Sequence, residues 1–403
     1  MTASLLHLVE HTTTRLAADE LPAAVGERLW RQYSDRILVE PPSFKTENHW
    51  LLTPQGWAGH IPIDHDYRVF IEPKIEISSL FRMLEYAYKL SFLASGEMVG
   101  ATNIQEFYER LSRILALRIL DRSRKGFHRE YVARSNRLPY LRGKLNLESM
   151  LQPPTEVSLD CSYHENTADI EDNQILTWTL YCIARHGFVR DDIAQVIRRA
   201  YRATQSASTL RPVSPALCSN RSYTRLNNDY AELHALCRFF LEHGGPGHKQ
   251  GSRSMLPFLV NMPRLYELFV SEWLRVHLPT HLAISEQYGV TLGEQDEVRF
   301  EIDLLICDRA TGAPRALLDT KYKAPNSPSA SDVEQVIAYA KAIGCKKAAL
   351  VYPQQLPTAF DHIVGQEISV WSTEFCLSGD LDENGKSFLS ALLERVDSTS
   401  VLS

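Results

Sequence analysis

The sequence contains no uninterrupted apolar run approaching the ~20 residues that a membrane-spanning helix requires, so we expect no membrane span. Its amino terminus has no basic patch followed by an apolar core, so we expect no secretory signal. The seven cysteines never form a CxxC pair, which argues against a zinc ribbon or a disulfide framework and favours a reducing, cytoplasmic compartment. A formal net charge of −6 is atypical of proteins that coat nucleic acid, so any contact with nucleic acid should be local or shared with a partner.

Several nucleotide-binding and catalytic motifs are also missing. The phosphate-loop pattern GxxxxGK[ST] and the dinucleotide pattern GxGxxG do not occur, so the chain should not bind a nucleotide by either route. The nucleophile elbow GxSxG and the zinc-binding pattern HExxH are absent as well. The sequence therefore gives no support to those enzyme classes.

The chain is long enough, at 403 residues, for two or three domains. Residues 36–77 alternate apolar and polar side chains and predict short strands, whereas residues 171–243 carry apolar stripes at helical spacing. Glycine, serine and proline dominate residues 244–254, so we place the main domain boundary there, between residues 1–250 and 251–403. Helices and strands alternate after this boundary. The predicted fold class is α/β, with an amino-terminal β-plus-helical region.

Residues 118–144 are far more basic than the chain as a whole, because nine cations oppose only Asp121 and Glu130. The cations are Arg118, Arg122, Arg124, Lys125, Arg129, Arg134, Arg137, Arg142 and Lys144. The seven from residue 124 onward are candidates for contact with DNA or a partner, because lysine and arginine release counterions from nucleic acid when they pair with phosphate. A solvated helix end followed by a basic hairpin explains the same pattern, and the sequence leaves both interpretations open.

The most informative stretch for chemistry runs from residue 297 to residue 323. Asp303 lies in the β-rich segment FEIDLLI, and Asp319 and Lys321 follow in RALLDTKYK. Because strand side chains alternate between faces, Asp319 and Lys321 should project from the same face. The turn RATGAPR between the two segments predicts a hairpin, which can bring Asp303 alongside Asp319. Two carboxylates and one ammonium group are therefore expected to meet.

This grouping suits metal-assisted hydrolysis of a phosphodiester bond. Asp303 and Asp319 are the candidate ligands of a hard divalent cation, with Mg²⁺ as the expected ion because it prefers oxygen ligands. The metal would lower the pKa of a bound water and neutralise charge on the phosphate. Lys321 would orient or activate that water. A DxK pair on a strand is also common as an ordinary surface ion pair, which is the simpler alternative.

Helical residues on both sides of this stretch extend the candidate site. Glu267, in the helix before the first strand, is a possible third carboxylate, although an exposed helix glutamate needs no functional explanation. Gln335 and Tyr339 are spaced i, i+4 and share one helix face, from which Gln335 can support the lysine or the water. Tyr322 and Lys323 are expected to be structural or to face DNA rather than to catalyse.

The series of Glu267, Asp303, the Asp319–Lys321 pair and the QxxxY pattern resembles the PD-(D/E)xK nuclease superfamily. More specifically, the chain resembles the McrC family, the nuclease subunits of the McrBC modification-dependent restriction system. The likeness extends beyond the nuclease motif to IEPKI and LFRMLEYAY (71–88), LRGKLNL (141–147) and CSYHENTADIEDNQIL (161–176). It spans about residues 68–350.

The resemblance implies that the chain cleaves DNA with Mg²⁺, while a separate AAA+ GTPase of McrB type forms a hexameric ring that recognises and translocates modified DNA. It also implies that the amino-terminal part docks into that ring and stimulates its hydrolysis. The family's metal-binding acids correspond to Asp303 and Asp319, its lysine to Lys321 and its helix acid to Glu267. The proline of the first motif is absent, and Ile302 stands in its place.

These inferences combine into one expected architecture, a PD-(D/E)xK restriction-endonuclease-like domain over residues 251–403 behind an amino-terminal adaptor over residues 1–250. Its expected function is DNA cleavage in a defence system against phage and other foreign DNA. Two nuclease domains brought together would cut both strands of a duplex. A non-catalytic activator of a ring NTPase and a partner-independent DNA repair nuclease are the alternative interpretations.

Overall fold

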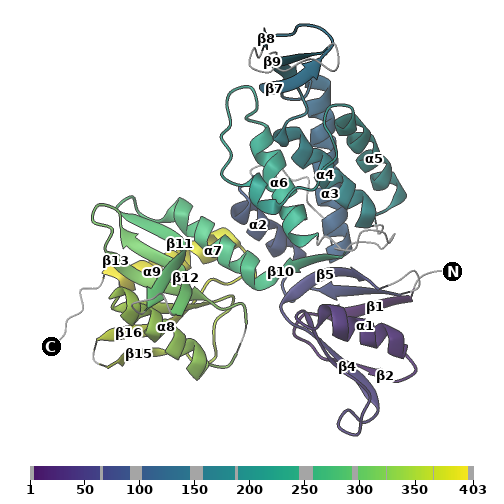
Figure 1. Ribbon diagram of the computed structural model, residues 1–403. Coiled ribbons are helices and arrows are strands. Elements are labelled where there is room, and N and C mark those ends of the chain that lie inside the picture. The colour runs from purple at the N-terminus through teal and green to yellow at the C-terminus, as the bar shows by residue number, and fades with distance from the viewer. Residues whose placement is uncertain are drawn as a thin grey trace. The chain divides into compact units, whose positions relative to one another are not determined.

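The protein is described by a computed structural model that covers residues 4–63, 67–90, 102–145, 158–186, 189–244, 257–292, 298–323, 325–365 and 367–397. Its contacts divide the chain into two compact units (Figure 1). Met1–Phe107 and Phe258–Ser403 form what we call the terminal unit, and Tyr108–Pro257 forms the inserted unit. The boundary predicted near residue 250 lies outside the described residues.

The amino-terminal part of the terminal unit contains two small sheets and two helices. Its elements are β1 (Ser4–Val9), β2 (Thr14–Ala17), α1 (Ala23–Tyr33), β3 (Ile37–Glu40), β4 (His49–Pro54), β5 (Trp57–Pro62), β6 (Tyr67–Glu72) and α2 (Ile77–Ala87). One sheet has the strand order β2-β4-β3, and the other has the order β1-β6-β5-β10. Leu8, Leu29 and Val69 contribute to their shared hydrophobic core. The strands predicted over residues 36–77 are therefore present.

Strand β10 (Phe258–Asn261) explains why the terminal unit is discontinuous, since it returns after the inserted unit and pairs antiparallel with β5. Gly59 permits this pairing. A Cβ atom at position 59 would lie 2.1 Å from the carbonyl oxygen of Phe258, and the φ of +145° favours glycine. A sheet that began in the first seventy residues is thus completed by a strand about two hundred positions later.

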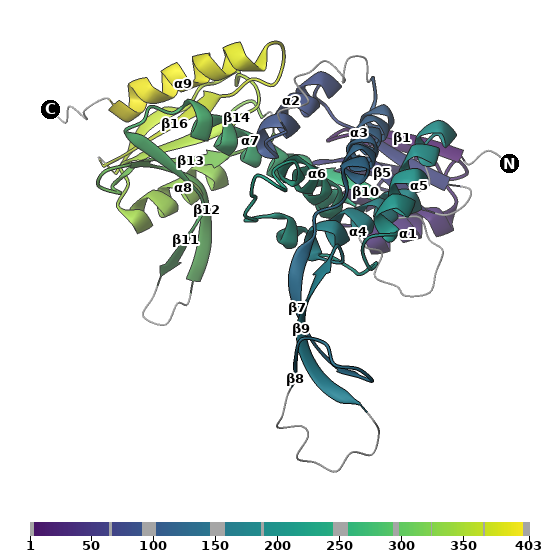
Figure 2. The ribbon, with the colours of Figure 1, turned by 90° about the horizontal axis from the view of Figure 1, so that it is seen from above.

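The inserted unit combines helices with a small antiparallel sheet. Its elements are most of α3 (Ile104–Lys125), then β7 (Glu130–Leu138), β8 (Lys144–Leu145), β9 (Leu159–Thr167), α4 (Glu171–His186), α5 (Asp191–Gln205), the 3₁₀ helix η3 (Pro215–Cys218) and α6 (Tyr230–His243). Asn103 caps α3, because its Oδ1 accepts a hydrogen bond from the backbone N of Glu106. Figure 2 shows the β7-β9-β8 sheet extending away from the helices of this unit.

The carboxyl-terminal part of the terminal unit is built around a six-stranded mixed sheet with the order β11-β12-β13-β14-β16-β15. Its elements are α7 (Met262–His277), β11 (Leu282–Leu292), β12 (Val298–Asp308), β13 (Pro314–Thr320), α8 (Ala330–Ile343), β14 (Lys347–Tyr352), β15 (Asp361–Val364), β16 (Ile368–Glu374) and α9 (Leu381–Asp397). β11 to β13 run antiparallel, whereas β13, β14 and β16 are parallel. Helices α8 and α9 lie on opposite sides of this sheet (Figure 2).

The mixed α/β class predicted from the sequence is confirmed by these several sheets and their helices. All seven cysteines are free thiols. Within the described ranges, no helix combines the length and the apolar character needed to cross a bilayer.

Candidate active site

The antiparallel pair β12–β13 brings the two predicted carboxylates together. Leu304 pairs with Leu318, so Asp303 and Asp319 are the next residues along the two strands, where the ladder ends. The Oδ2 atom of Asp303 accepts hydrogen bonds from the backbone N and the Oγ1 of Thr320, at 2.9 and 3.1 Å. These bonds fix the carboxylate of Asp303 and leave its Oδ1 atom for another ligand.

Asp319 and Lys321 lie together beyond the apolar centre of β13, as their two-residue spacing predicts. Asp319 is 1% exposed, and its Oδ2 atom lies 2.6 Å from the Nζ atom of Lys321. The contact is an ion pair, and Oδ2 has no other hydrogen-bond partner among the described residues. Burial and the nearby charge of Asp303 raise the pKa of Asp319 to about 7, and Lys321 opposes this shift.

Lys321 keeps its charge in this partly buried position. Burial lowers the pKa of its ammonium group, but the negative charges of Asp319, Asp332 and Asp303 outweigh that effect and raise the pKa above its usual value. The Nζ atom also donates a 2.9 Å hydrogen bond to Oε1 of Gln335. The lysine is therefore a fixed cation rather than a ready proton acceptor.

Helix α8 supplies the support that the QxxxY spacing predicts. The Nε2 atom of Gln335 donates a 2.8 Å hydrogen bond to the hydroxyl of Tyr339, one helical turn further on. The ring of Tyr339 stacks on Phe300 of β12, with ring centroids 5.0 Å apart. A chain of contacts thus runs from the sheet through Tyr339 and Gln335 to the lysine, and it fixes the position of the ammonium group.

Asp332 is a further member of the site that our reading of the sequence missed. Its carboxylate lies 2.5 Å from Nζ of Lys323 and 3.8 Å from Nζ of Lys321, and the residue is buried. Burial raises the pKa of Asp332, but Lys323 and the hydroxyl of Ser329 lower it by more. The S-x-x-D pattern signals only a helix cap, which α8 indeed has at Ser329. The ion pairs with both lysines became visible only in the fold.

Glu267 lies on α7 and is less closely attached to the site than predicted. Its carboxylate accepts a hydrogen bond from Arg264. Burial raises its pKa despite that bond, and the charges of Asp303 and Glu286 raise it further. In the described part of the chain, Glu267, Asp303 and Asp319 do not form a group whose ligand atoms all lie within 4.8 Å. Glu267 thus lies within electrostatic range of Asp303, and its role as a third metal ligand remains a prediction.

Tyr322 and Lys323 border a cavity beside the site. Tyr322 is buried, and its hydroxyl donates a 3.2 Å hydrogen bond to Glu10, at the end of β1. Burial raises the pKa of Glu10 to about 7, although the backbone N of Lys74 and the hydroxyl of Tyr322 lower it. The cavity of about 560 Å³ is also lined by His11, Lys74, Pro353 and Leu377. Tyr322 is therefore a structural link between the amino-terminal strands and β13.

Comparison with known proteins identifies the family. A family model described as "McrBC 5-methylcytosine restriction system component" matches residues 52–353. The chain belongs to this family. A curated relative, the type IV methyl-directed restriction enzyme EcoKMcrBC of Escherichia coli K12, is 24% identical over 220 residues. That match covers 51% of this chain and 61% of the relative, so it spans less than two thirds of that protein.

The fold is similar to that of a solved structure, the refined half-complex from a tetradecameric assembly of Thermococcus gammatolerans McrB AAA+ hexamers with bound McrC. The TM-score is 0.59 at 16% sequence identity, and the alignment covers 97% of this chain and 100% of the compared chain. At this identity the likeness concerns the fold. Together with the family match, it confirms the resemblance to McrC-like proteins that the sequence motifs indicated.

In this McrBC-family chain, most arginines of the basic segment 118–144 have ion-pair or hydrogen-bond partners. Most of these partners come from β9, from α6 or from its N-cap Asp229, all distant in sequence, and Asp121 lies within α3 itself. The pairs are Arg118–Glu232, Arg122–Asp229, Arg124–Asp121, Arg129–Asn166, Arg134–Glu165, Arg137–Asp160 and Arg142–Glu165. Arg142 also lies over the ring of Tyr163, 3.9 Å from its centroid. The predicted role of these cations in contacting DNA or a partner remains a prediction, on a surface less positive than the local sequence suggests.

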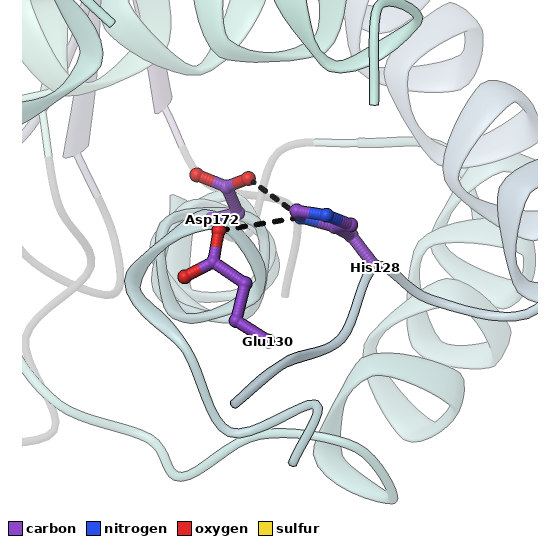
Figure 3. A group of neighbouring side chains, drawn as sticks. All are labelled: His128, Glu130 and Asp172. Carbon is purple, nitrogen blue, oxygen red and sulfur yellow. Dashed lines mark hydrogen bonds and ion pairs between the residues drawn. The ribbon is translucent and has the colours of Figure 1, made fainter. Parts of the chain in front are cut away.

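A second candidate metal group lies in the inserted unit. One ligand atom from each of His128, Glu130 and Asp172 lies within 4.8 Å of the others, so the three could hold a metal ion (Figure 3). However, Arg221 and Asn227 already donate hydrogen bonds to the two oxygens of Asp172. A guanidinium group beside this carboxylate opposes a cation, so we interpret the group as a structural polar network.

Proposed function

We propose that this McrBC-family chain is the endonuclease subunit of a modification-dependent restriction system and hydrolyses DNA phosphodiester bonds with Mg²⁺. We further propose that its mixed sheet is a PD-(D/E)xK nuclease fold. The observation that carries the proposal is the convergence of Asp303, Asp319 and Lys321 where the β12–β13 ladder ends, with Gln335 on the lysine. The identity of the E. coli relative as a methyl-directed restriction enzyme supports the same activity.

The donor set fits Mg²⁺. Asp303 and Asp319 present carboxylate oxygens, the ligands that this ion prefers, and each has an oxygen that other hydrogen bonds leave available. The pKa of Asp319 is raised by its burial and by the nearby charge of the half-buried Asp303, more than Lys321 offsets. A divalent cation between them would relieve that repulsion. Glu267 is the candidate for an additional or water-mediated ligand.

Bound Mg²⁺ would supply positive charge to the phosphate and make a coordinated water more acidic. The residues of the chain do the rest. Lys321, held as a cation by Asp319 and Asp332, stabilises negative charge that develops on the phosphate and orients the attacking water. Gln335 and Tyr339 keep the ammonium group in place. Lys321 therefore acts through the position of its charged ammonium group and not through a lowered pKa.

The proposed partner is an AAA+ GTPase of McrB type, assembled as a hexameric ring. The structure to which this fold is similar contains McrC bound to McrB AAA+ hexamers. We propose that the present chain docks on such a ring and activates its GTP hydrolysis. The projecting β7-β9-β8 sheet, which carries Arg134, Arg137, Arg142 and Lys144, is the candidate docking element. Pairing of two nuclease domains would then cut both strands.

The test combines the full chain with its AAA+ partner, GTP, Mg²⁺ and methylated DNA. Asp303→Asn and Asp319→Asn should each abolish cleavage while they leave GTP hydrolysis by the partner stimulated. Full cleavage by either variant contradicts the proposed site. Stimulation of GTP hydrolysis without cleavage by the wild-type chain would establish the non-catalytic activator instead. Rapid cleavage by the chain alone would establish a partner-independent nuclease.

A further inference from the structure

Helix α5 presents an arginine-rich face to solvent. Ile193, Ile197, Ala200 and Thr204 form its buried face. The opposite face carries three exposed arginines, which we call the α5 arginine surface: Arg198, Arg199 and Arg202. Arg198 and Arg202 are spaced i, i+4, so they are neighbours on one helix face with their Cβ atoms about 6 Å apart.

Among the described residues, these three arginines have no anionic partner, unlike most arginines of segment 118–144. Over the residues that the structure describes, no acidic side chain lies within ion-pair distance of Arg198, Arg199 or Arg202. The acids of α5, Asp191 and Asp192, are in its first turn. Asp192 pairs there with Arg190. The second half of the helix therefore keeps uncompensated positive charge in a chain whose net charge is −6.

Aromatic residues pack this helix against α4. Trp178 stacks on Tyr181 with ring centroids 5.3 Å apart, and Tyr181 contacts Tyr201 of α5 at 6.2 Å. The hydroxyl of Tyr201 accepts a 2.9 Å hydrogen bond from Gln205. The helix backbone therefore holds the Cα atoms of the three arginines at fixed spacing, which reduces the ordering needed when a polyanion binds.

We propose that the α5 arginine surface contacts the phosphate backbone of DNA. The inference deepens the proposed function, because it names the surface that holds the substrate outside the cleavage site. Arginine suits phosphate because its planar guanidinium donates two parallel hydrogen bonds and stays charged at every physiological pH. Contacts of this kind position the protein on DNA without reading its sequence. The contact should thus be independent of base modification, which fits the earlier expectation that recognition lies in a partner.

The experiment measures binding of the full-length chain to a fluorescently labelled DNA duplex in EDTA, where cleavage plays no part. The double variant Arg198→Gln with Arg202→Gln removes two exposed, unpaired cations, so its thermal unfolding should match that of the wild type. Each lost phosphate contact lowers the salt dependence of log K by roughly 0.9. We expect the slope to fall by about 2 and the affinity at low salt to fall about 10-fold.

A charge-matched control separates a specific contact from loss of net charge. Arg31→Gln with Lys45→Gln also removes two exposed cations, which lie in the terminal unit and pair with Glu27 and Glu40. This control should keep the wild-type slope. An equal loss in both double variants, or no measurable binding of DNA by the wild-type chain, overturns the proposal. Unchanged DNA binding with weaker binding of the AAA+ partner would assign the surface to a protein contact instead.

The outcome is also distinguishable from failure of the proposed function. Asp319→Asn tests cleavage, whereas the double variant of α5 tests DNA binding, so the two proposals can fail separately. If the α5 variant loses DNA binding while the wild-type chain never cleaves, the surface stands and the nuclease assignment falls. If cleavage depends on Asp319 but the α5 variant binds DNA normally, the nuclease assignment stands and the α5 arginine surface is not the DNA contact.

Discussion

The candidate active site and the basic segment 118–144 both stand out in the sequence as concentrations of charge, but the fold treats them in opposite ways. At the ends of β12 and β13, it brings like charges together and leaves one of them, Asp319, with a pKa of about 7. Along β7 and α3, it brings opposite charges from β9 and α6 to arginines that have few anions nearby in sequence.

The difference indicates where function resides. Each ion pair of a partly exposed arginine contributes little to stability, so its presence does not by itself indicate a functional site. A buried carboxylate beside another carboxylate costs stability and persists where a ligand or a reaction requires it. Uncompensated charge in the folded state is therefore a better guide to a site than a charge run in the sequence. By this criterion the β12–β13 site and the α5 arginine surface are the candidates.

The strongest test of the comparison between site charges and ordinary ion pairs uses two lysines that directly follow β13, Lys321 and Lys323. Lys321→Met should reduce DNA cleavage about 10²–10⁴-fold, because it removes the cation that stabilises the phosphate and orients the water. Lys323→Met, which removes an ion pair with Asp332 at the rim, should reduce it less than about 10-fold. Single-turnover cleavage measures both. Equal losses would show that the two lysines act only through Asp332.

Glu10, the buried acid that accepts a hydrogen bond from Tyr322, should make the free energy of unfolding fall as the pH rises. Glu10 is fully buried and has a folded-state pKa of about 7, against 4.5 in the unfolded chain. Between these values the unfolded state releases its proton while the folded state retains it, so the free energy of unfolding decreases with pH, by about 3 kcal/mol at most. Glu10→Gln should flatten this dependence in denaturant titrations from pH 4.5 to 8.

An exposed glutamate provides the control of opposite sign. Hydrogen bonding and charge from Arg15 lower the pKa of Glu47 below its usual value. Glu47→Gln should thus remove a contribution that is present above the unfolded pKa and lost as the pH falls. A pH profile that Glu10→Gln leaves unchanged would mean that Glu10 is ionised in its buried position.

The like-charge pair predicts a conflict between stability and activity at Asp319. Asp319→Asn should abolish cleavage but stabilise the metal-free protein at pH 8 by about 2 kcal/mol, because it removes a buried carboxylate whose folded-state pKa is raised. The gain should shrink as the pH falls from about 7 towards 3.8, because the folded state keeps the carboxyl protonated while the unfolded state takes up its proton. Addition of Mg²⁺ should narrow the difference by stabilising the wild type. Destabilisation at pH 8 without Mg²⁺ would contradict the electrostatic account.

The smallest effect is expected in the basic segment. Glu165→Gln removes the anion shared by Arg134 and Arg142, whose side chains are each 40% exposed. The free energy of unfolding should change by less than about 1 kcal/mol, because exposed ion pairs are weak. Urea unfolding measures this directly. A decrease in the free energy of unfolding above about 2 kcal/mol would show that these exposed pairs affect stability as strongly as the buried charges of the site do.

Much of the local geometry of the candidate site followed from periodicity. The two-residue spacing of Asp319 and Lys321 predicted a shared strand face, and the four-residue spacing of Gln335 and Tyr339 predicted the hydrogen bond that joins them. The hairpin between the two strands predicted that Asp303 would face Asp319. Residues typical of helix ends also flank α3, which lies between Asn103 and Gly126. The catalytic roles of the site residues Asp319, Lys321 and Gln335 remain predictions.

Long-range partners could not be read in this way. The sequence analysis assigned no role to Asp332 or Glu10, but the fold places both against residues of the DTKYK segment. The sequence also gave no sign that β10 would complete a sheet begun by β1, or that the terminal unit would be discontinuous. Pairings of this kind depend on packing between segments that no local period connects.

The sequence by itself determined the chemical groups and their local alternation, since helical and strand periods are properties of the backbone. Only the tertiary structure decided which charges are compensated, because Coulomb energies depend on distance and burial rather than on position along the chain. The acids of the site were therefore recognisable from their motif, whereas the neutralised arginines of segment 118–144 and the unpaired arginines of α5 were distinguished only by the fold.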